Sequence, residues 1–419
     1  MLSKTSESDF APKTAHFSFI VKDNTFQQVC LISYDMDFRE TRYGVCTPGF
    51  KAAGVKRGRY GVALILADGV CGTAAVFTGN NVKAAPVKYT KGMFRNGVQA
   101  VVANSGNANC CVPGGMEDAR EMASEASRVL GVGLRHVAVS STGIIGRRMD
   151  VHAVKELIQE AADRLTPSPK GSLQAAKAIM TTDRRIKMYS AECGGVHVGG
   201  ICKGAGMIAP DMATMLCYIT TNAIVRGAEL QSALREAVEE SFNMISVEGD
   251  MSTNDTVLLM SSMSVRCGLK DFKQLLKRVT GELARMIVRD GEGASKFIEV
   301  EVRGARSAGD ARRGVKAVIN SPLVKTAFYG ENPNWGRIAA AMGSAIRFDE
   351  GKLDISFASG SSTARVVKSG RTMSLDAAKR ILANRNIKVV VDLHAGGHSA
   401  VGWGCDMTTD YVRINAGYS

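Results

Sequence analysis

One threonine in this sequence stands where the chain could expose a nucleophile. Thr214 lies in the stretch KGAGMIAPDMATMLCYITT, between a glycine-rich loop and an apolar segment that predicts a rigid strand. Gly204 and Gly206 allow a sharp turn before it, and Pro210 removes a backbone donor and restricts the preceding residue. These features would place the Thr214 hydroxyl at the head of a strand.

Cleavage of the bond between Ala213 and Thr214 would give this threonine its own α-amino group. Such an amine has a pKa of about 7.7–8.0, so it can accept the hydroxyl proton near neutral pH. A threonine activated in this way can carry out acyl transfer without a histidine. From the residues alone, however, a threonine at the start of a strand is far more often a packing residue.

Four other patterns resemble functional sites, but their surroundings do not support them. His394 and His398 have H-x₃-H spacing without a Cys or carboxylate in the pattern, so HAGGH predicts a turn and not a metal site. KGAG precedes a strand and lacks the frame of a phosphate-binding loop. Asn254 begins a glycosylation sequon without any sign of secretion, and Cys110 and Cys111 have no evident histidine partner. We therefore expect no metal site and no thiol catalysis.

Short apolar strands alternate with amphipathic helices from Tyr43 onward. Strands are predicted at Gly61–Gly69, Ala74–Gly79, Val98–Gly106, Lys296–Gly304 and Ile387–Leu393. Helices are predicted at 116–131, 149–165 and 227–245, and a fourth begins after an N-cap at Asp271 and stops near Gly291. This alternation indicates an α/β fold with layered sheets and helices.

The composition is that of a globular protein with sizeable cores. The chain has 419 residues, of which 45% are hydrophobic and 22% charged, enough for two or three compact domains. No apolar run reaches the ~18–20 residues of a membrane span. The net charge of +13 is spread over isolated basic pairs, without the basic run of a nucleic-acid-binding surface. The charge therefore indicates first an ordinary solvated surface and next a small anionic substrate, and it does not favour nucleic acid.

The cysteines and the first 40 residues indicate in which cellular compartment the protein is located. Ten cysteines are scattered without a C-x-x-C pattern, which indicates free thiols in a reducing compartment. Residues 1–40 show no clear periodicity and contain several acidic residues but few arginines, unlike a transit peptide or a secretory signal. We expect a cytoplasmic protein, with the mitochondrial matrix as the alternative.

Ten blocks of the sequence, in order, resemble the ornithine acetyltransferase family of arginine biosynthesis. They are FKAAGVKRG, VFTGNNVKAAPV, ANSGNANCC, SSTGIIG, AIMTTD, GAGMIAPDMATMLCYITTNA, STNDTVLLM, GEGASKFIEV, SPLVKTAFYGENPNWGRI and WGCDMTTDYVRINAGYS. The resemblance runs from about Val45 to Ser419. Members of this family cleave themselves, and bifunctional members also make N-acetylglutamate.

The resemblance implies a role for each matching residue. Thr214 matches the nucleophile, Ala213–Thr214 the bond of self-cleavage, and Thr142 and Gly143 the pair that forms the oxyanion hole. The matches to substrate-binding positions are Thr181, Lys203, Thr214, Glu292, Asn415 and, weakly because the chain stops about one residue early, Ser419. We expect Lys203 to meet a substrate carboxylate and Glu292 the amino end of ornithine. The ordinary alternative for these two residues is a surface ion pair.

The resemblance also implies an architecture and an assembly. The fold would be a four-layer helix/sheet sandwich of the self-processing ornithine acetyltransferase type, with a second, smaller α/β domain. After an extension of unknown role at 1–40, cleavage would leave an α chain at 41–213 and a β chain at 214–419. Two of each would form a heterotetramer. No cofactor is implied, and acetyl-CoA would be a second acetyl donor if the enzyme is bifunctional.

The implied activity moves the acetyl group of N²-acetylornithine to glutamate through an acetyl-threonine intermediate. One alternative is a self-cleaving aminopeptidase or amidase of similar architecture, in which water replaces glutamate. Another is a basic nucleic-acid-binding protein, suggested by the net charge alone. Glutamate-dependent release of ornithine would separate the enzymes, and binding that weakens steeply with salt would favour nucleic acid.

Overall fold

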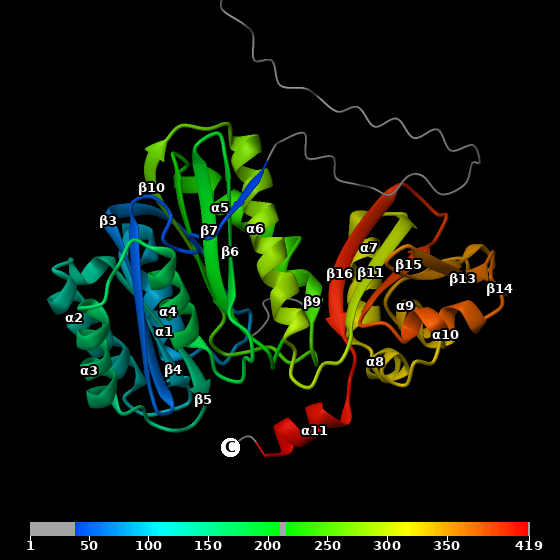
Figure 1. Cartoon of the computed structure of the whole chain (residues 1–419), viewed down its shortest axis with the longest axis horizontal. Helices are drawn as coiled ribbons and strands as arrows, with labels where there is room; N and C mark the ends of the chain where they lie inside the picture. Colours follow the sequence, from blue (N-terminus) through cyan, green and yellow to red (C-terminus); the bar gives the residue numbers. More distant parts are fainter. Residues whose placement is uncertain (1–37, 210–214, 418–419) are drawn as a thin grey trace, which may run out of the picture. The chain divides into compact units, whose positions relative to one another are not determined.

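The computed structural model describes residues 38–209 and 215–417 (Figure 1). These residues form a mixed α/β fold with two sheets, as the sequence predicts. Three of the predicted site residues, Ala213, Thr214 and Ser419, lie outside the described residues. The division of the chain at residue 214 and the role of residues 1–40 therefore stay predictions.

A single long strand, β3 (Tyr60–Phe77), connects the two parts of a nine-stranded sheet. Its first part pairs with β2 and β4, and its second part pairs with β10. The remaining partners are β2 (Phe50–Arg57), β4 (Val98–Asn107), β5 (Val137–Ile144), β10 (Thr256–Val265), β8 (Leu216–Ala223), β7 (Val196–Lys203), β6 (Lys187–Cys193) and β1 (Arg39–Thr41). The two separate strands predicted at 61–69 and 74–79 are therefore wrong. Residues 68–70, which lie between most of the two predicted strands, are exposed but remain within β3, where the register shifts between Leu66 and Cys71.

Three apolar cores separate four layers in this part of the chain. Helices α2 (Gly115–Leu130) and α3 (Val151–Ala162) pack on the sub-sheet β2–β3–β4–β5. Helices α5 (Gly227–Glu239) and α6 (Leu269–Arg289) cover the other sub-sheet, on the opposite side in Figure 1. Between the sub-sheets lies a core that includes residues of α4 (Pro169–Ile179). This is the four-layer sandwich that the resemblance to the ornithine acetyltransferase family implies.

The helix boundaries follow local signals, with two corrections. Asp150 caps α3 by accepting a hydrogen bond of 3.1 Å from Ala153 N, and α2 ends at Gly131 in a left-handed conformation. Helix α6 begins at Leu269, so Asp271 lies in its first turn and is not its N-cap; a carboxylate is favourable at either place, which makes the two hard to distinguish. Helix α5 stops at Glu239, and a 3₁₀ turn (Phe242–Met244) replaces the rest of the predicted helix.

The second, smaller α/β domain is built on a seven-stranded sheet. Strand β11 (Phe297–Ala305) pairs in parallel with β15 (Asn386–Asp392), and both coincide closely with predicted strands. The other strands are β14 (Arg371–Thr372), β13 (Ser362–Lys368), β12 (Asp354–Ser359), β16 (His398–Cys405) and β9 (Ile245–Ser246). The helices that follow β11 are α7 (Ala308–Asn320), α8 (Pro322–Tyr329), α9 (Trp335–Ala345), α10 (Asp376–Leu382) and α11 (Thr409–Ala416).

The strands that carry the predicted site meet at one edge of the larger sheet. Strand β7 ends at Lys203, which pairs with Leu216 at the start of the antiparallel strand β8. Leu216 in turn pairs with Thr256 at the start of β10. The glycine-rich loop, the first described residue after Thr214 and the segment before β10 are therefore brought together. Within the described residues, no helix is both long and apolar enough to cross a membrane.

Candidate active site

The predicted oxyanion pair lies at the end of β5, where its pairing with β4 is irregular. Thr142 is buried, with 5% of its surface exposed. Gly143 has a φ of +134°, and a Cβ at this position would lie 2.4 Å from the carbonyl carbon of Gly106. Only glycine fits there, because a side chain would collide with the backbone of β4. The backbone of Thr142 and Gly143 is thus fixed by the packing of two strands.

Asn254 connects this region to the strand that follows the site. Its Nδ2 donates to the carbonyl oxygens of both Ser141 and Ala108, each at 2.7 Å, and Ser141 directly precedes Thr142. The next residue, Asp255, accepts a hydrogen bond of 2.9 Å from Met215 N at its Oδ1. Two consecutive side chains therefore hold the oxyanion strand and the residue that follows Thr214.

The glycine-rich loop leaves β7 in a conformation that requires glycine. Gly204 has a φ of +154°, and its N–H donates to Asp183 Oδ1 at 2.7 Å. A Cβ on Gly206 would lie 2.4 Å from the carboxyl carbon of Glu292, so Glu292 packs directly on the loop backbone. Glu292 N also donates to Ala205 O at 2.8 Å. The loop before the predicted cleavage bond is therefore held between Asp183 and Glu292.

Lys203 and Thr181, two of the predicted substrate-binding residues, are in contact. Lys203 Nζ lies 3.4 Å from Thr181 Oγ1, and only 4% of the Lys203 surface is exposed. Burial lowers the pKa of Lys203, although the carboxylates of Asp183 and Asp255 oppose this shift. A buried lysine of this kind is not part of a surface ion pair. A surface ion pair, which the sequence left open as the alternative role of Lys203, is thus excluded.

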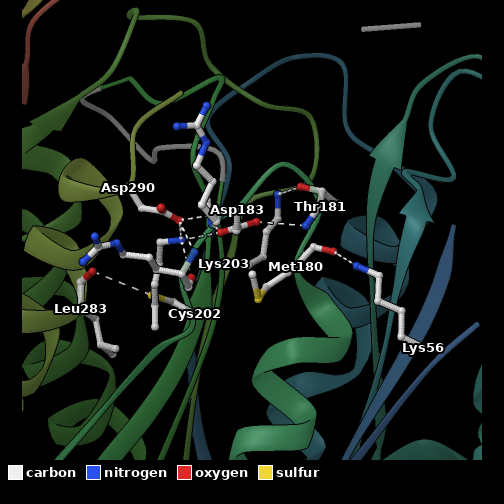
Figure 2. A network of polar contacts seen from close by, with 12 residues as sticks. Lys56, Met180, Thr181, Asp183, Cys202, Lys203, Leu283 and Asp290 are labelled. Carbon is white, nitrogen blue, oxygen red and sulfur yellow. Dashed lines mark hydrogen bonds and ion pairs between the residues drawn. The ribbon is translucent and has the colours of Figure 1, made fainter. Parts of the chain in front are cut away.

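A buried ion triad lies directly behind this pair. Lys187 Nζ contacts Asp183 Oδ1 and Asp290 Oδ2, both at 2.6 Å, and all three side chains are at least 97% buried. Figure 2 shows Asp183, Thr181, Lys203 and Asp290 within one network of hydrogen bonds and ion pairs, in which Lys187 links the two carboxylates. Asp183 Oδ2 also accepts from Thr181 N at 3.0 Å. The triad therefore positions both Thr181 and the loop at Gly204.

The charges in this triad stabilise one another. Burial alone would raise the pKa of Asp183, but Lys187, Lys203 and the hydrogen bond from Gly204 outweigh it and hold that pKa at about 2. Burial would likewise lower the pKa of Lys187, and the two carboxylates reverse that shift. Asp290 Oδ2 also accepts from the N–H groups of Arg184 and Arg185, at 3.0 and 3.1 Å. Asp183 and Lys187 thus stabilise each other's charged forms, and the carboxylate of Asp290 is well supplied with hydrogen-bond donors.

Glu292 and Asn415 form a second pair of predicted binding residues. Asn415, on α11, donates from Nδ2 to Glu292 Oε2 at 2.9 Å. Glu292 is half-buried and Asn415 is exposed. Glu292 is therefore only partly buried beside the glycine-rich loop, where a substrate could reach its carboxylate. Such a carboxylate is suited to a substrate amino group.

A second glutamate, Glu248, lies close to this pair. Its Oε1 accepts from Ile208 N at 3.1 Å, while Oε2 is buried and has no hydrogen-bond partner among the described residues. Burial and the neighbouring Glu292 raise the pKa of Glu248 to about 8. Glu248 therefore carries a proton at neutral pH and holds the loop two residues before Pro210.

The structure brings four predicted residues together in two pairs, Thr181 with Lys203 and Glu292 with Asn415, on either side of one loop. Sequence reasoning missed the residues that support them, which are Asp183, Lys187, Glu248, Asn254, Asp255 and Asp290. One signal was available for Asn254 and Asp255, because two polar residues directly precede a strand that is apolar over its first half.

Two of the patterns that the sequence analysis rejected can be located in the structure. His394 Nε2 lies 3.3 Å from Asp354 Oδ2, and the sulfurs of Cys110 and Cys111 lie 3.7 Å apart.

The part of the chain that the structure describes contains neither a disulfide nor a cluster of side chains suited to a metal ion. None of the nine cysteines in this part forms a disulfide. No group of three or more His, Cys, Asp or Glu side chains in this part is arranged to hold a metal ion. Burial raises the pKa of the Cys110 thiol, which disfavours its reactive thiolate form.

Comparison with known proteins decides the family. A model described as the ArgJ family matches residues 48–419, nearly the whole chain. The chain belongs to the ArgJ family. Two relatives illustrate the similarity. A glutamate N-acetyltransferase of Methanosarcina acetivorans is 46% identical over 391 residues, which cover 90% of this chain and 98% of the relative. An arginine biosynthesis bifunctional protein ArgJ of Symbiobacterium thermophilum is 45% identical over 400 residues, 90% of this chain and 98% of the relative.

Solved structures of ArgJ proteins are also similar to parts of the chain. The ArgJ protein of Bacillus halodurans is 39% identical, with a TM-score of 0.44, and covers 48% of this chain and 98% of its own. An ornithine acetyltransferase of Mycobacterium tuberculosis, solved with ornithine, is 32% identical, with a TM-score of 0.39, and covers 43% of this chain and 100% of its own. The ArgJ match spans every residue predicted above for the site.

Proposed function

We propose that this ArgJ-family chain is a glutamate N-acetyltransferase that takes its acetyl group from N²-acetylornithine. The observation that carries the proposal is the arrangement of Lys203 and Glu292 about the loop that leads to Thr214: Lys203 lies where the loop leaves β7, and Glu292 packs on the loop from the segment after α6. A buried lysine and a half-buried carboxylate beside one loop suit a substrate that carries both a carboxylate and an amino group. The names of the relatives, glutamate N-acetyltransferase and bifunctional ArgJ, support the same activity.

Self-cleavage comes first in this proposal. Thr214 Oγ attacks the carbonyl carbon of Ala213, and the acyl group moves from nitrogen to oxygen to give an ester. Water then hydrolyses the ester, which leaves a carboxylate on Ala213 and a free amine and hydroxyl on Thr214. The two chains would stay joined, because β7 and β8 pair from Val198–Thr221 to Lys203–Leu216. We propose that two such cleaved pairs form the heterotetramer, in the cytoplasm.

Acetyl transfer then proceeds in two half-reactions. The Thr214 amine takes the hydroxyl proton while Oγ attacks the amide carbonyl of acetylornithine. The C–N bond breaks, the same proton passes to the departing nitrogen of ornithine, and an acetyl-threonine ester remains. The α-amine of glutamate attacks this ester, gives a proton to the Thr214 amine, and the proton returns to Oγ as N-acetylglutamate leaves.

The oxyanion of both half-reactions needs hydrogen-bond donors that are already in place. We assign this role to Thr142 and Gly143, since the contact of Gly143 with Gly106 fixes the backbone there. One such donor typically lowers the barrier by about 2.7–4 kcal/mol. Acetyl-CoA as a second donor belongs to the same proposal, because it would form the same acetyl-threonine ester.

Intact-mass analysis of the wild type beside Thr214→Ala is the first test. We expect two fragments from the wild type, with a new N-terminus at Thr214, and an uncut variant. Initial rates with acetylornithine and glutamate should then give parallel lines in double-reciprocal plots. A chain that stays whole, or intersecting lines, would contradict the mechanism. Ornithine release that needs no glutamate would instead indicate an amidase.

A further inference from the structure

The predicted binding residues Glu292 and Asn415 lie on two segments that leave the seven-stranded sheet side by side. Glu292 lies in the segment that joins α6 to β11, and Asn415 lies on α11, which follows β16. Strands β11 and β16 pair in antiparallel fashion, with Phe297 at the start of one opposite Cys405 at the end of the other. The segment before β11 and the segment after β16 are therefore neighbours.

Asp406 joins these two segments directly after β16. Its side chain is buried, with 3% of the residue exposed. Its Oδ1 accepts from Ser295 N and from Lys296 N, both at 2.9 Å, and its Oδ2 accepts from the Ser295 hydroxyl. Hydrogen bonds to a charged group are among the stronger ones in proteins. One carboxylate therefore fixes the short stretch that follows Glu292.

The two neighbours of Asp406 are anchored to one buried lysine on α8. Lys325 Nζ donates to Cys405 O at 2.7 Å, and Met407 N donates to Lys325 O at 3.4 Å. Only 1% of the Lys325 surface is exposed. The backbone on both sides of Asp406 is thus held by the smaller domain, independently of the contact with Ser295 and Lys296.

A second polar contact, two residues further along, places the start of α11. Thr408 Oγ1 donates to Gly293 O at 2.7 Å and accepts from Tyr411 N at 3.2 Å. One hydroxyl therefore caps the helix and holds it to the residue that follows Glu292. Gly293 has a φ of +67°, and a Cβ there would lie 2.3 Å from Tyr411 N, so the two backbones are in direct contact.

Apolar packing contributes little to the position of α11. None of its eight residues is buried, and 61% of the Val412 surface is exposed. A helix of this length is not stable on its own in water. The contacts made by Asp406 and Thr408, together with the hydrogen bond from Asn415 to Glu292, therefore hold this helix in place.

We propose that Asp406, assisted by Thr408, is a positioning residue for substrate binding, which sets the relative placement of Glu292 and Asn415 that the amino end of acetylornithine requires. Asp406 acts through this pair and not by contact with the substrate. The inference rests on the proposed function, in which Glu292 binds that amino group. It also gives the smaller domain a part in the site, because β16 and α8 carry the contacts that hold the pair.

The test measures KM and kcat for acetylornithine in Asp406→Ala and Asp406→Asn. Alanine removes all three hydrogen bonds of the carboxylate. We expect KM to rise about 10–100-fold and kcat to change less, because a displacement of about 1 Å can cost about 10²-fold. Asparagine keeps an acceptor for the two N–H groups and offers Ser295 Oγ an amide donor, so Asp406→Asn should keep the KM of the wild type.

The matched control is Asp354→Ala, on β12 of the same domain. Asp354 also accepts from a backbone N–H, that of Ser369, at 2.7 Å, so the control loses a similar contact elsewhere. Its KM should equal that of the wild type. A KM that rises equally in Asp354→Ala and Asp406→Ala would overturn the inference, because the effect would then follow from a general loss of stability.

A double variant separates positioning from an independent effect on binding. If Asp406 acts through Glu292, then adding Asp406→Ala to Glu292→Gln should raise KM little further. Independent effects would multiply instead. Multiplied effects, or a wild-type KM in Asp406→Ala, would overturn the inference.

Thr408→Val and Thr408→Ser provide a second pair of variants if Asp406→Ala does not fold. Valine keeps the shape of threonine but loses the contacts with Gly293 O and Tyr411 N, whereas serine keeps both. KM should rise in the valine variant alone, and equal KM values in the two would overturn the inference. If the wild type transfers no acetyl group to glutamate, the proposed function fails and this inference with it. If it does, and Glu292→Gln raises KM, only the role of Asp406 and Thr408 is at stake.

Discussion

Lys187 Nζ lies 2.6 Å from Asp183 Oδ1, in an ion pair with 1% and 0% of the two side chains exposed. The same ammonium contacts Asp290 Oδ2, 103 residues away along the chain, at 2.6 Å. Asp183 orients Thr181 and Gly204, and Asp290 is two residues from Glu292. One buried lysine therefore fixes the relative positions of both pairs of binding residues.

Lys187→Met should destabilise the protein strongly. The substitution leaves the carboxylates of Asp183 and Asp290 buried without their common counter-ion. Removing one partner of a buried ion pair typically costs about 3–5 kcal/mol. We expect a loss of that size in the free energy of unfolding, measured by denaturant titration.

The matched control for that substitution is Lys277→Met on α6. Lys277 pairs with Glu240 at 2.9 Å near the surface, where such a pair contributes less than about 1 kcal/mol. Equal losses for the two variants would contradict a special role of the triad. A variant at Lys187 that is stable but inactive would instead place its role in substrate binding alone.

Asp183 should contribute stability that disappears in acid. Its pKa is about 2 in the folded protein, below the value of about 3.9 in an unfolded chain. A carboxyl with a lowered folded pKa stabilises the protein above its unfolded pKa and loses that contribution as the pH falls through its folded pKa. The difference in unfolding free energy between the wild type and Asp183→Asn should therefore shrink from about pH 4 to pH 2. A difference that is constant over this range would show that Asp183 does not titrate in this way.

Much of the fold follows from local patterns in the sequence. The alternation in Ile298–Val302 predicts a half-buried strand, and β11 is one, because the period of two is a property of each residue and its neighbours. The apolar stripe of α6 likewise identifies its buried face. Thr142, Gly143, Thr181, Lys203, Glu292 and Asn415 came from the resemblance to a family, and the described contacts pair four of these six.

The supporting residues could not be predicted in the same way. Asp183 and Lys187 flank the basic pair Arg184–Arg185, which by composition indicates a solvated surface. Their burial arises only when the start of β6 packs against the end of α6 near Asp290. The hydrogen bond from Met215 N to Asp255 is likewise a result of packing between β8 and β10. Such contacts between distant segments leave no periodic signal in the sequence.

Gly143→Ala should impair the oxyanion hole more than a similar change nearby. An added Cβ would lie 2.4 Å from the Gly106 carbonyl carbon, and the φ of +134° is unfavourable for alanine. We expect kcat for acetyl transfer to fall by about 10²–10³-fold. Gly146→Ala is the control, since Gly146 also has a positive φ, +79°, but its Cβ would meet nothing within 4 Å. If both variants keep wild-type kcat, the backbone at Gly143 does not form the hole.

Glu292→Gln should weaken the binding of acetylornithine. The variant keeps an acceptor for Asn415 Nδ2 but loses the negative charge that we assign to the substrate amine. A hydrogen bond to a charged group contributes about 1.5–3 kcal/mol, so KM should rise about 10–100-fold. Glu331→Gln, at the surface partner of Lys296, is the matched control and should leave KM unchanged. An unchanged KM in Glu292→Gln would remove this residue from the binding site.

Glu248→Gln should stabilise the protein increasingly as the pH rises. The pKa of Glu248 is about 8 in the folded protein and about 4.3 in an unfolded chain, because burial and Glu292 disfavour its charge. The stability that a raised pKa confers is complete below pH 4.3 and is lost as the pH rises through about 8, with a slope approaching 1.4 kcal/mol per pH unit. Gln has no proton to lose, so the variant should gain on the wild type between about pH 4.5 and 8 and then run parallel to it. Denaturant titrations at several pH values measure this, with the surface substitution Glu240→Gln as the control. A gap between wild type and variant that does not widen with pH would mean that Glu248 is ionised, and Ile208 would then be held by a carboxylate.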